Sequence, residues 1–87
     1  MKLVIQIPAW NEEEHLAEAI AALPREVTGF DRVEILVVDD GSDDRTATVA
    51  REAGARVVRL PVHRGLAVAF AAGIDAALER GADVIVN

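Results

Sequence analysis

The sequence predicts an α/β fold, a Rossmann-like parallel sheet with helices packed on its faces. Four short apolar runs alternate with three longer segments of helical periodicity, and the connections between them are short. Only 3% of the 87 residues are aromatic, so Val, Ile, Leu and Ala must fill the core, which suits tight packing of helices on a sheet. The order β-α-β-α-β-α-β implies parallel strands joined by right-handed crossovers.

The first strand is expected at residues 3–7, where an apolar run ends at Pro8. This run is too short for the apolar segment of a signal peptide, and three glutamates follow it closely. Asn11 is placed to cap the next helix, with Glu14 three residues later in the capping-box position. The helix is indicated by apolar residues at helical spacing before Pro24, namely Leu16, Ile20 and Leu23.

The second strand is expected at residues 33–38, and a cluster of turn formers ends it. Asp43 or Asp44 can cap a second helix over about residues 46–53. Gly54 is then placed to end that helix in a left-handed conformation.

The third strand is expected at residues 57–60 and the fourth at residues 84–86. Between them a long helix should begin at about Gly65 and end at Gly81. An apolar stripe of this helix is expected to face the core, and its members are Leu66, Phe70, Ile74, Ala77 and Leu78. The Ala and Gly residues of this helix should allow close approach to the sheet.

Composition excludes several classes of function. The formal net charge of −6 argues against a nucleic-acid-binding module, because neutralising phosphates along a strand requires a basic face. Cysteine is absent, so neither a disulfide framework nor a thiolate metal site is possible. No segment approaches the ~20 apolar residues of a membrane span. We therefore expect a cytoplasmic protein, with any attachment to the cytoplasmic membrane face made through C-terminal parts.

The length allows one small domain and not two. The chain ends at Asn87, inside or just after the fourth expected strand, with no helix to cover that strand. We therefore expect residues 1–87 to be the N-terminal, nucleotide-binding part of a longer domain. The exposed edge of such a part favours self-association, so a homo-oligomer is a further expectation.

In an open parallel sheet a ligand lies at the carboxyl ends of the strands, near the point where the strand order reverses. That rule selects the loops at residues 8–12, 39–44 and 61–65. The first loop has no glycine, which argues against a dinucleotide site of the NAD or FAD type. The chain also lacks Gly-Lys-Ser and Gly-Lys-Thr, which argues against a P-loop.

Asp39 and Asp40 stand together where the second strand ends. Paired carboxylates there can accept hydrogen bonds from a base N–H or a ribose hydroxyl, or help to hold a divalent cation. Asp40, Ser42 and Asp43 fit a turn and a helix cap equally well. The residues alone leave both interpretations open.

The other two loops carry further candidates for ligand contacts. Glu12 is the glutamate nearest to a strand end and is assigned to a ligand, whereas its two neighbours suit the positive end of a helix dipole. Trp10 either flanks a base or covers the sheet edge. His63 and Arg64 precede the long helix and can meet a diphosphate. A solvated loop is the simpler interpretation of His63.

Three sets of residues follow one another along the chain: Pro8-Ala9-Trp10-Asn11-Glu12-Glu13, then Val37-Val38-Asp39-Asp40-Gly41-Ser42 with Asp44 and Thr46, then Arg64-Gly65 with Gly73. In this order and spacing they resemble the N-terminal motifs of inverting family 2 glycosyltransferases, especially the dolichol- and polyprenyl-phosphate sugar transferases. The resemblance spans the whole chain. Trp10 stands where that family usually has Tyr, and His63 stands where Asn is common.

The resemblance implies a GT-A fold that binds a UDP-, GDP- or dTDP-sugar donor and transfers its sugar to a lipid phosphate or a glycan. The nucleotide-binding residues that it implies are Pro8, Ala9, Trp10 and Glu12 around the base and ribose, Asp39 or Asp40 on the base, and Arg64 by a looser match. The family's Asp-x-Asp, which holds Mg²⁺ or Mn²⁺, is expected after Asn87, and the catalytic base further on. Residues 1–87 are thus expected to contain no catalytic residue and no metal ligand, and to be inactive alone.

Three other functions are considered. A nucleotidyltransferase-like enzyme requires a Gly-rich loop with Arg or Lys after the first strand, which this chain lacks. A receiver-like signalling module requires a phosphate-accepting Asp at the end of its third strand, where Leu60 and Pro61 stand. An isolated half-domain that self-associates is the third alternative.

Overall fold

The computed structural model describes all residues, 1–87, and contains one four-stranded sheet of strand order β3-β2-β1-β4. Every neighbouring pair of strands is parallel. The elements are β1 (Lys2–Ala9), α1 (Leu16–Ala21), β2 (Arg32–Asp39), α2 (Thr46–Glu52), β3 (Arg56–Arg59), α3 (Leu66–Glu79) and β4 (Val84–Val86). The predicted order of strands and helices is therefore confirmed.

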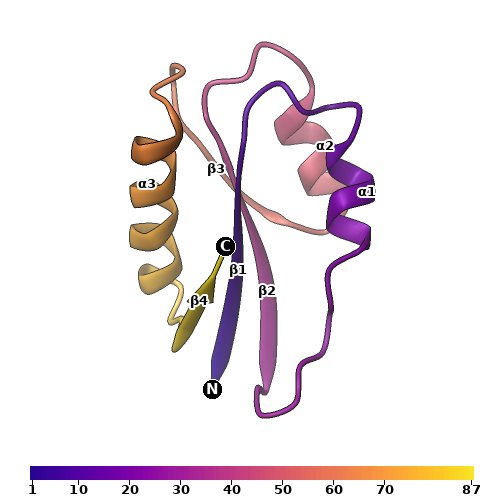
Figure 1. Cartoon of the computed structure of the whole chain (residues 1–87), viewed down its shortest axis with the longest axis vertical. Coiled ribbons are helices and arrows are strands. Elements are labelled where there is room, and N and C mark those ends of the chain that lie inside the picture. The colour runs from indigo at the N-terminus through magenta and orange to yellow at the C-terminus, as the bar shows by residue number, and fades with distance from the viewer.

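Helices cover both faces of the sheet, with α1 and α2 on one face and α3 on the other (Figure 1). Alternate residues of each strand point to opposite faces. Ile35 and Val37 of β2 therefore pack in a core cluster with α1 and α2, whereas Leu36 packs with Val4 and Ala77 beneath α3. These two apolar layers fix the sheet between the helices. None of the three helices combines the length and the hydropathy that a membrane span requires.

The face of α3 that meets the sheet differs from the expected one. Leu66 is 72% exposed and Leu78 is 59% exposed, whereas Ala69, Gly73 and Ala77 are buried. The helix lies so close to the sheet that a Cβ added at Gly73 would overlap the side chain amide of Gln6. Only small residues fit that distance, so the predicted core stripe was wrong at Leu66, Phe70 and Leu78, which are exposed, and right at Ala77, which is buried. The predicted close approach through Ala and Gly is confirmed.

The start of α1 also differs from the prediction. The helix begins at Leu16, and no side chain caps it. Asn11 instead has a left-handed backbone with a φ of 51°, which Asn tolerates better than most residues. Its side chain bonds to the neighbouring loop and not to the helix. The predicted capping box of Asn11 and Glu14 was therefore wrong.

The ends of α2 and α3 have the expected chemistry. Gly54 and Gly81 have positive φ angles, and hydrogen bonds from Ala55 N to Ala50 O and from Ala82 N to Ala77 O close each helix in a Schellman arrangement. At the start of α2, an Asp44 carboxylate oxygen accepts the backbone amide of Thr46 at 2.9 Å.

A partly buried ion network ties the amino end of the sheet to the end of α3. Lys2 Nζ lies 3.1 Å from Glu34 Oε2 and donates a 2.7 Å hydrogen bond to the carbonyl of Arg80. The Arg80 guanidinium pairs with the same Glu34 carboxylate. The hydrogen bond from Arg80 lowers the pKa of Glu34 and outweighs the opposing effect of burial. The network holds α3 in place from the end opposite to its first turn.

Candidate functional site

The carboxyl ends of β1, β2 and β3 meet at one edge of the sheet, at the top of Figure 1. The chain moves outward from β1 through β2 to β3 and then returns to place β4 on the other side of β1. The strand order therefore reverses at β1, and the loop after β1 lies at the point where open α/β sheets bind ligands. The loops at 8–12, 39–44 and 61–65 converge there, as the sequence predicted.

Asn11 joins the first two of these loops. Its backbone amide donates to Ser42 Oγ at 2.9 Å, and its side chain oxygen accepts the amide of Asp43 at 3.0 Å. The backbone amide of Glu12 also donates a hydrogen bond to Thr46 Oγ1, at 2.9 Å, which links the loop after β1 to the start of α2. The loops after β1 and β2 are thus held together by side chains that satisfy backbone amides, which keeps the strand ends in a fixed geometry.

Asp40 joins the end of β2 to the start of α3. One carboxylate oxygen accepts the amide of Arg64 at 2.8 Å and the other accepts the amide of Gly65 at 2.9 Å. Burial of Asp40 acts to raise its pKa, but these two amides and the neighbouring His63 outweigh it and hold the pKa below its ordinary value. The side chain is therefore a buried anion that organises the first turn of α3.

His63 links Asp40 to Trp10. Its Nδ1 lies 2.9 Å from Asp40 Oδ2, and its ring stacks on the Trp10 indole with centroids 4.2 Å apart and planes at 27°. The loop is solvated, as the simpler interpretation held, but the His63 ring is bonded to Asp40 and stacked on Trp10. Trp10 is still 47% exposed, so part of its surface is open to a ligand.

These residues border a hollow of about 150 Å³, which we call the Trp10 hollow. Its lining residues are Pro8, Ala9, Trp10, Asp40, His63, Leu66 and Ala69. A space of about 150 Å³ is enough for one six-membered aromatic ring. The walls combine an apolar floor, an exposed indole and one buried carboxylate, which is a suitable environment for a flat heterocycle with N–H groups.

Glu12 does not lie in this hollow. It borders a neighbouring one on the α1 side of β1, with Ile7, His15, Leu16 and Ala19, and Pro8 and Ala9 are the only residues that line both. We call this second space the Glu12 hollow. Glu12 was predicted to lie with Asp40 at the same edge of the sheet, and the structure separates the two residues by the end of β1.

Asp39 and Asp40 point to opposite faces of the sheet, because they are consecutive residues at a strand end. Asp39 is 1% exposed, accepts the amide of Ser42 at 3.0 Å and lies 3.5 Å from the Arg59 guanidinium. The two carboxylates therefore cannot chelate one cation together. No group of three or more His, Asp and Glu side chains is arranged to hold a metal ion.

The backbone amide of Arg64 donates a hydrogen bond to Asp40. The Arg64 side chain is exposed and does not line the Trp10 hollow.

Two residues that line the Trp10 hollow, Leu66 and Ala69, were not predicted from the sequence, because both were assigned to the body of a helix. The role of Asn11 was not predicted either. The signal that could have found Leu66 is its position directly after Gly65, at the first turn of the helix that follows a strand-end loop.

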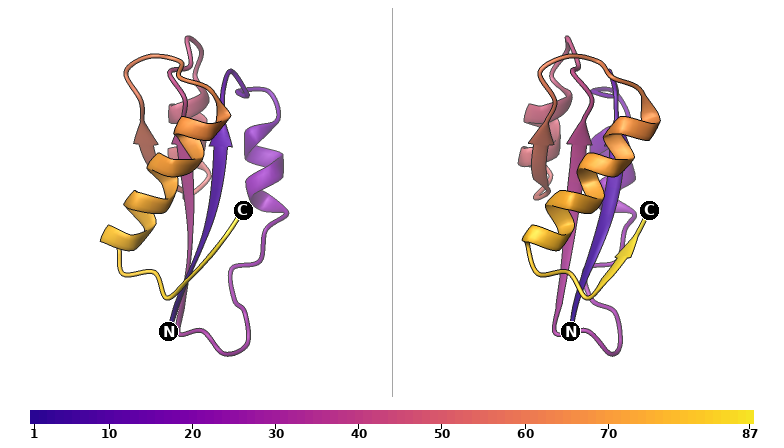
Figure 2. Two further views of the ribbon diagram at one scale, coloured as in Figure 1. Left: turned by 60° about the vertical axis from the view of Figure 1, so that its left-hand side comes forward. Right: turned by 90° about the vertical axis from the view of Figure 1, so that its left-hand side faces the viewer.

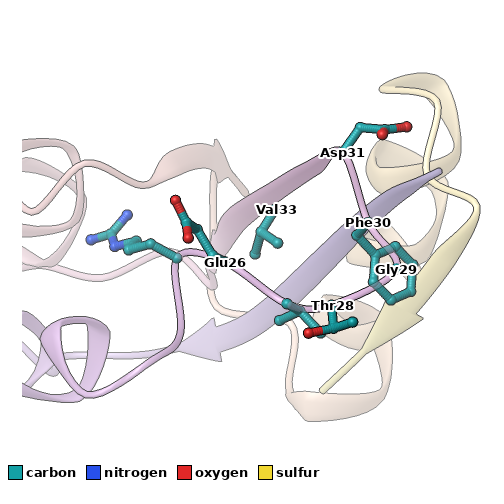
Figure 3. Close-up of a pocket in the computed structure, with 8 residues that line it drawn as sticks. Glu26, Thr28, Gly29, Phe30, Asp31 and Val33 are labelled. Atoms are coloured by element: carbon teal, nitrogen blue, oxygen red, sulfur yellow. The ribbon is translucent and has the colours of Figure 1, made fainter.

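The largest hollow, of about 510 Å³, lies at the opposite end of the molecule, along the loop between α1 and β2 (Figure 3). Its lining residues are 25–31 and Val33. In Figure 3 the side chains of Glu26 and Asp31 project on one side of the loop and that of Thr28 projects on another. Their polar groups do not converge, and the hollow lies at the amino ends of the strands. We therefore place the candidate site at the Trp10 hollow.

Residues 4–86 match the family model described as "Glycosyl transferase family 2". A dolichol-phosphate mannosyltransferase of Pyrococcus furiosus is 36% identical over 90 residues, which is 99% of this chain and 24% of that protein. The chain spans between 13% and 34% of the length of the curated relatives that it matches.

Solved structures show the same fold. The crystal structure of glucosyl-3-phosphoglycerate synthase from M. tuberculosis superposes with a TM-score of 0.71 at 32% identity, over 86% of this chain and 30% of that one. A mannosyltransferase from Pyrobaculum calidifontis, in complex with GDP-Man and Mn²⁺, gives a TM-score of 0.52 at 25% identity, over 92% of this chain and 24% of that one. The expected α/β arrangement and its likeness to GT-A enzymes are confirmed.

Proposed function

Because the chain belongs to glycosyl transferase family 2, we propose that the Trp10 hollow holds the nucleoside of a nucleotide-sugar donor. The observation that carries the proposal is the convergence of Trp10, Asp40 and His63 at the point where the strand order reverses. The mannosyltransferase that resembles this chain is in complex with GDP-Man, which supports a donor of the UDP-, GDP- or dTDP-sugar class.

The base stacks on the exposed part of the Trp10 indole, in place of His63 or beside it. Asp40 accepts a hydrogen bond from a base N–H, since an ionised carboxylate has about four acceptor sites, and the amides of Arg64 and Gly65 together with His63 Nδ1 occupy three of them. Such a bond to a charged acceptor in a half-enclosed site is stronger than a neutral one. Asp40, rather than Asp39, is therefore the base ligand in this proposal.

The other predicted residues take supporting positions. Pro8 and Ala9 form the floor under the base, because they line both hollows. Glu12 contacts the ribose from the Glu12 hollow, and the exposed Arg64 side chain meets the diphosphate. Asp39 has no direct contact with the donor and instead fixes the turn at Ser42.

We further propose that the whole protein transfers a sugar from this donor to a polyprenyl phosphate or a growing glycan. The relative from Pyrococcus furiosus is named a dolichol-phosphate mannosyltransferase, which supports the lipid-phosphate class. A divalent cation implied by the family has no ligand set within these 87 residues. The contribution of this chain is therefore to bind and orient the nucleoside.

Calorimetric titration of GDP, UDP and dTDP tests this function. We expect one of them to bind with a 1:1 stoichiometry, and Asp40→Asn to weaken that binding by roughly 10-fold or more, because a hydrogen bond to a charged group contributes about 1.5–3 kcal/mol. Asp75→Asn is the matched control, since Asp75 is exposed on α3 and does not line the hollow. Equal binding by Asp40→Asn and the parent would contradict the proposal.

A further inference from the structure

The side chain of His63 makes the two contacts that are proposed for the base. Its ring stacks on the Trp10 indole with centroids 4.2 Å apart, and its Nδ1 lies 2.9 Å from Asp40 Oδ2. The base is assigned a stack on the same indole and an N–H bond to the same carboxylate. An imidazole is itself a flat nitrogen heterocycle with an N–H group, so it reproduces both contacts from within the chain.

The imidazole and a base cannot share one face of Trp10. Two ring planes in contact are about 3.5 Å apart, so a base between the two rings would need a separation of about 7 Å. The centroid separation of 4.2 Å leaves no such space. At Asp40, Oδ2 accepts the amide of Gly65 and also faces His63 Nδ1, which takes both acceptor sites of that oxygen. Departure of the imidazole therefore frees an indole face and an acceptor site together.

The backbone around His63 is held in place, whereas its side chain has room to turn. A Cβ added at Gly41 would lie 2.3 Å from the backbone nitrogen of His63, so the loop after β3 packs directly on the loop after β2. The next two backbone amides, of Arg64 and Gly65, are bonded to Asp40. The His63 side chain is 48% exposed. The ring can thus leave by a change of rotamer, while the loop and Asp40 keep their positions.

We propose that His63 is an internal stand-in for the base, which a nucleotide displaces when it binds. This inference rests on the proposed function. Because the imidazole competes for Trp10 and Asp40, the apparent dissociation constant of a nucleotide rises as the fraction of chains with an open site falls. A ligand that only stacks, or that only accepts hydrogen bonds, cannot replace both contacts of the imidazole. His63 therefore sets the affinity of the site and favours flat ligands that carry an N–H group.

Calorimetric titration of the parent and of His63→Ala with GDP, UDP and dTDP tests this competition. We expect His63→Ala to bind the preferred nucleotide more tightly, by roughly 2- to 10-fold, because no ring has to leave the indole. His63→Phe keeps a ring against Trp10 and should show no such gain. Val62→Ala is the matched control and should bind as the parent does, since Val62 is exposed in the same loop and does not line the hollow. Equal or weaker binding by His63→Ala would overturn the proposal.

Proton NMR of the unmodified chain follows the ring itself. Trp10 is the only tryptophan, and its ring current should move the imidazole protons of His63 upfield in the free protein. Saturation with the nucleotide should return these protons to ordinary shifts. Binding with the upfield shift retained, or a free chain without that shift, would also overturn the proposal. Failure of the proposed function is a different outcome, because neither the parent nor His63→Ala would then bind any of the three nucleotides, and both proposals would fall.

Discussion

The imidazole of His63 lies 2.9 Å from the carboxylate of Asp40, and the two residues come from loops that follow different strands. The same ring stacks on Trp10, which follows a third strand. One side chain therefore connects the three loops at the carboxyl edge of the sheet. The arrangement places an exposed aromatic face and a buried anion around one small hollow.

Replacement of Trp10 by Ala should weaken nucleoside diphosphate binding. Stacking of a base on an aromatic side chain contributes about 1–3 kcal/mol, so the dissociation constant should rise by roughly 5- to 150-fold. Calorimetry with the nucleotide that binds the parent protein checks this. Phe30→Ala is the matched control, because Phe30 lines the distant hollow between α1 and β2 and should leave binding unchanged.

The stability of the chain should depend on pH through Asp40. The folded-state pKa of Asp40 is held below its ordinary value of 3.8, so its ionised form stabilises the fold above that pH. This contribution is lost as the pH falls through the lower, folded-state pKa. Urea unfolding of the parent and of Asp40→Asn, from pH 7 down to about pH 2, should show a stability difference that shrinks on acidification. A difference that is constant over this range would contradict the account.

Glu34→Gln should be strongly destabilising. The change leaves Lys2 and Arg80 without their shared carboxylate in a largely buried position. Breaking a buried pair by removing one partner costs about 3–5 kcal/mol, and about 2 kcal/mol or more is expected for this partly buried network. Glu52→Gln breaks only the exposed pair with Arg45 and should change the free energy of unfolding by less than about 1 kcal/mol. Similar losses in the free energy of unfolding for Glu34→Gln and Glu52→Gln would show that the network does not anchor α3.

Gly73→Ala should lower stability even though Ala favours a helix by about 1 kcal/mol. The new Cβ would overlap the Gln6 amide, which has to move within a packed layer, and overpacking costs typically about 1–3 kcal/mol. Adding Gln6→Ala should remove the overlap and recover stability relative to Gly73→Ala alone. Thermal or urea unfolding of the three variants measures this, and a stabilised Gly73→Ala would disprove the close contact.

The sequence was sufficient to predict the strands, because each buried run had to be apolar and ended at turn formers. It also selected the three loops that converge, since the carboxyl ends of parallel strands share one edge. The face of α3 could not be found this way. One stripe of α3 runs through Leu66 and another runs through Gly73. Which of the two packs on the sheet depends on the space left by the Gln6 and Val38 side chains.

The site was predicted less completely than the fold. Trp10 and Asp40 were placed correctly at one hollow, but Glu12 lies on the other side of the β1 end. Consecutive residues of a loop that leaves a strand can turn to either face, and no local pattern specifies which. Asn11 illustrates the same point, because its left-handed backbone and its bond to Asp43 depend on a loop 32 residues away.

The most direct test of a nucleoside site at the Trp10 hollow is a two-dimensional ¹H–¹⁵N NMR titration of the 87-residue chain with GDP, UDP and dTDP in turn. With the nucleotide that binds, we expect the largest shifts at the Trp10 indole N–H and at the backbone amides of Arg64 and Gly65. Shifts confined to residues 25–31, around the larger hollow, or no shifts with any of the three nucleotides, would contradict the assignment.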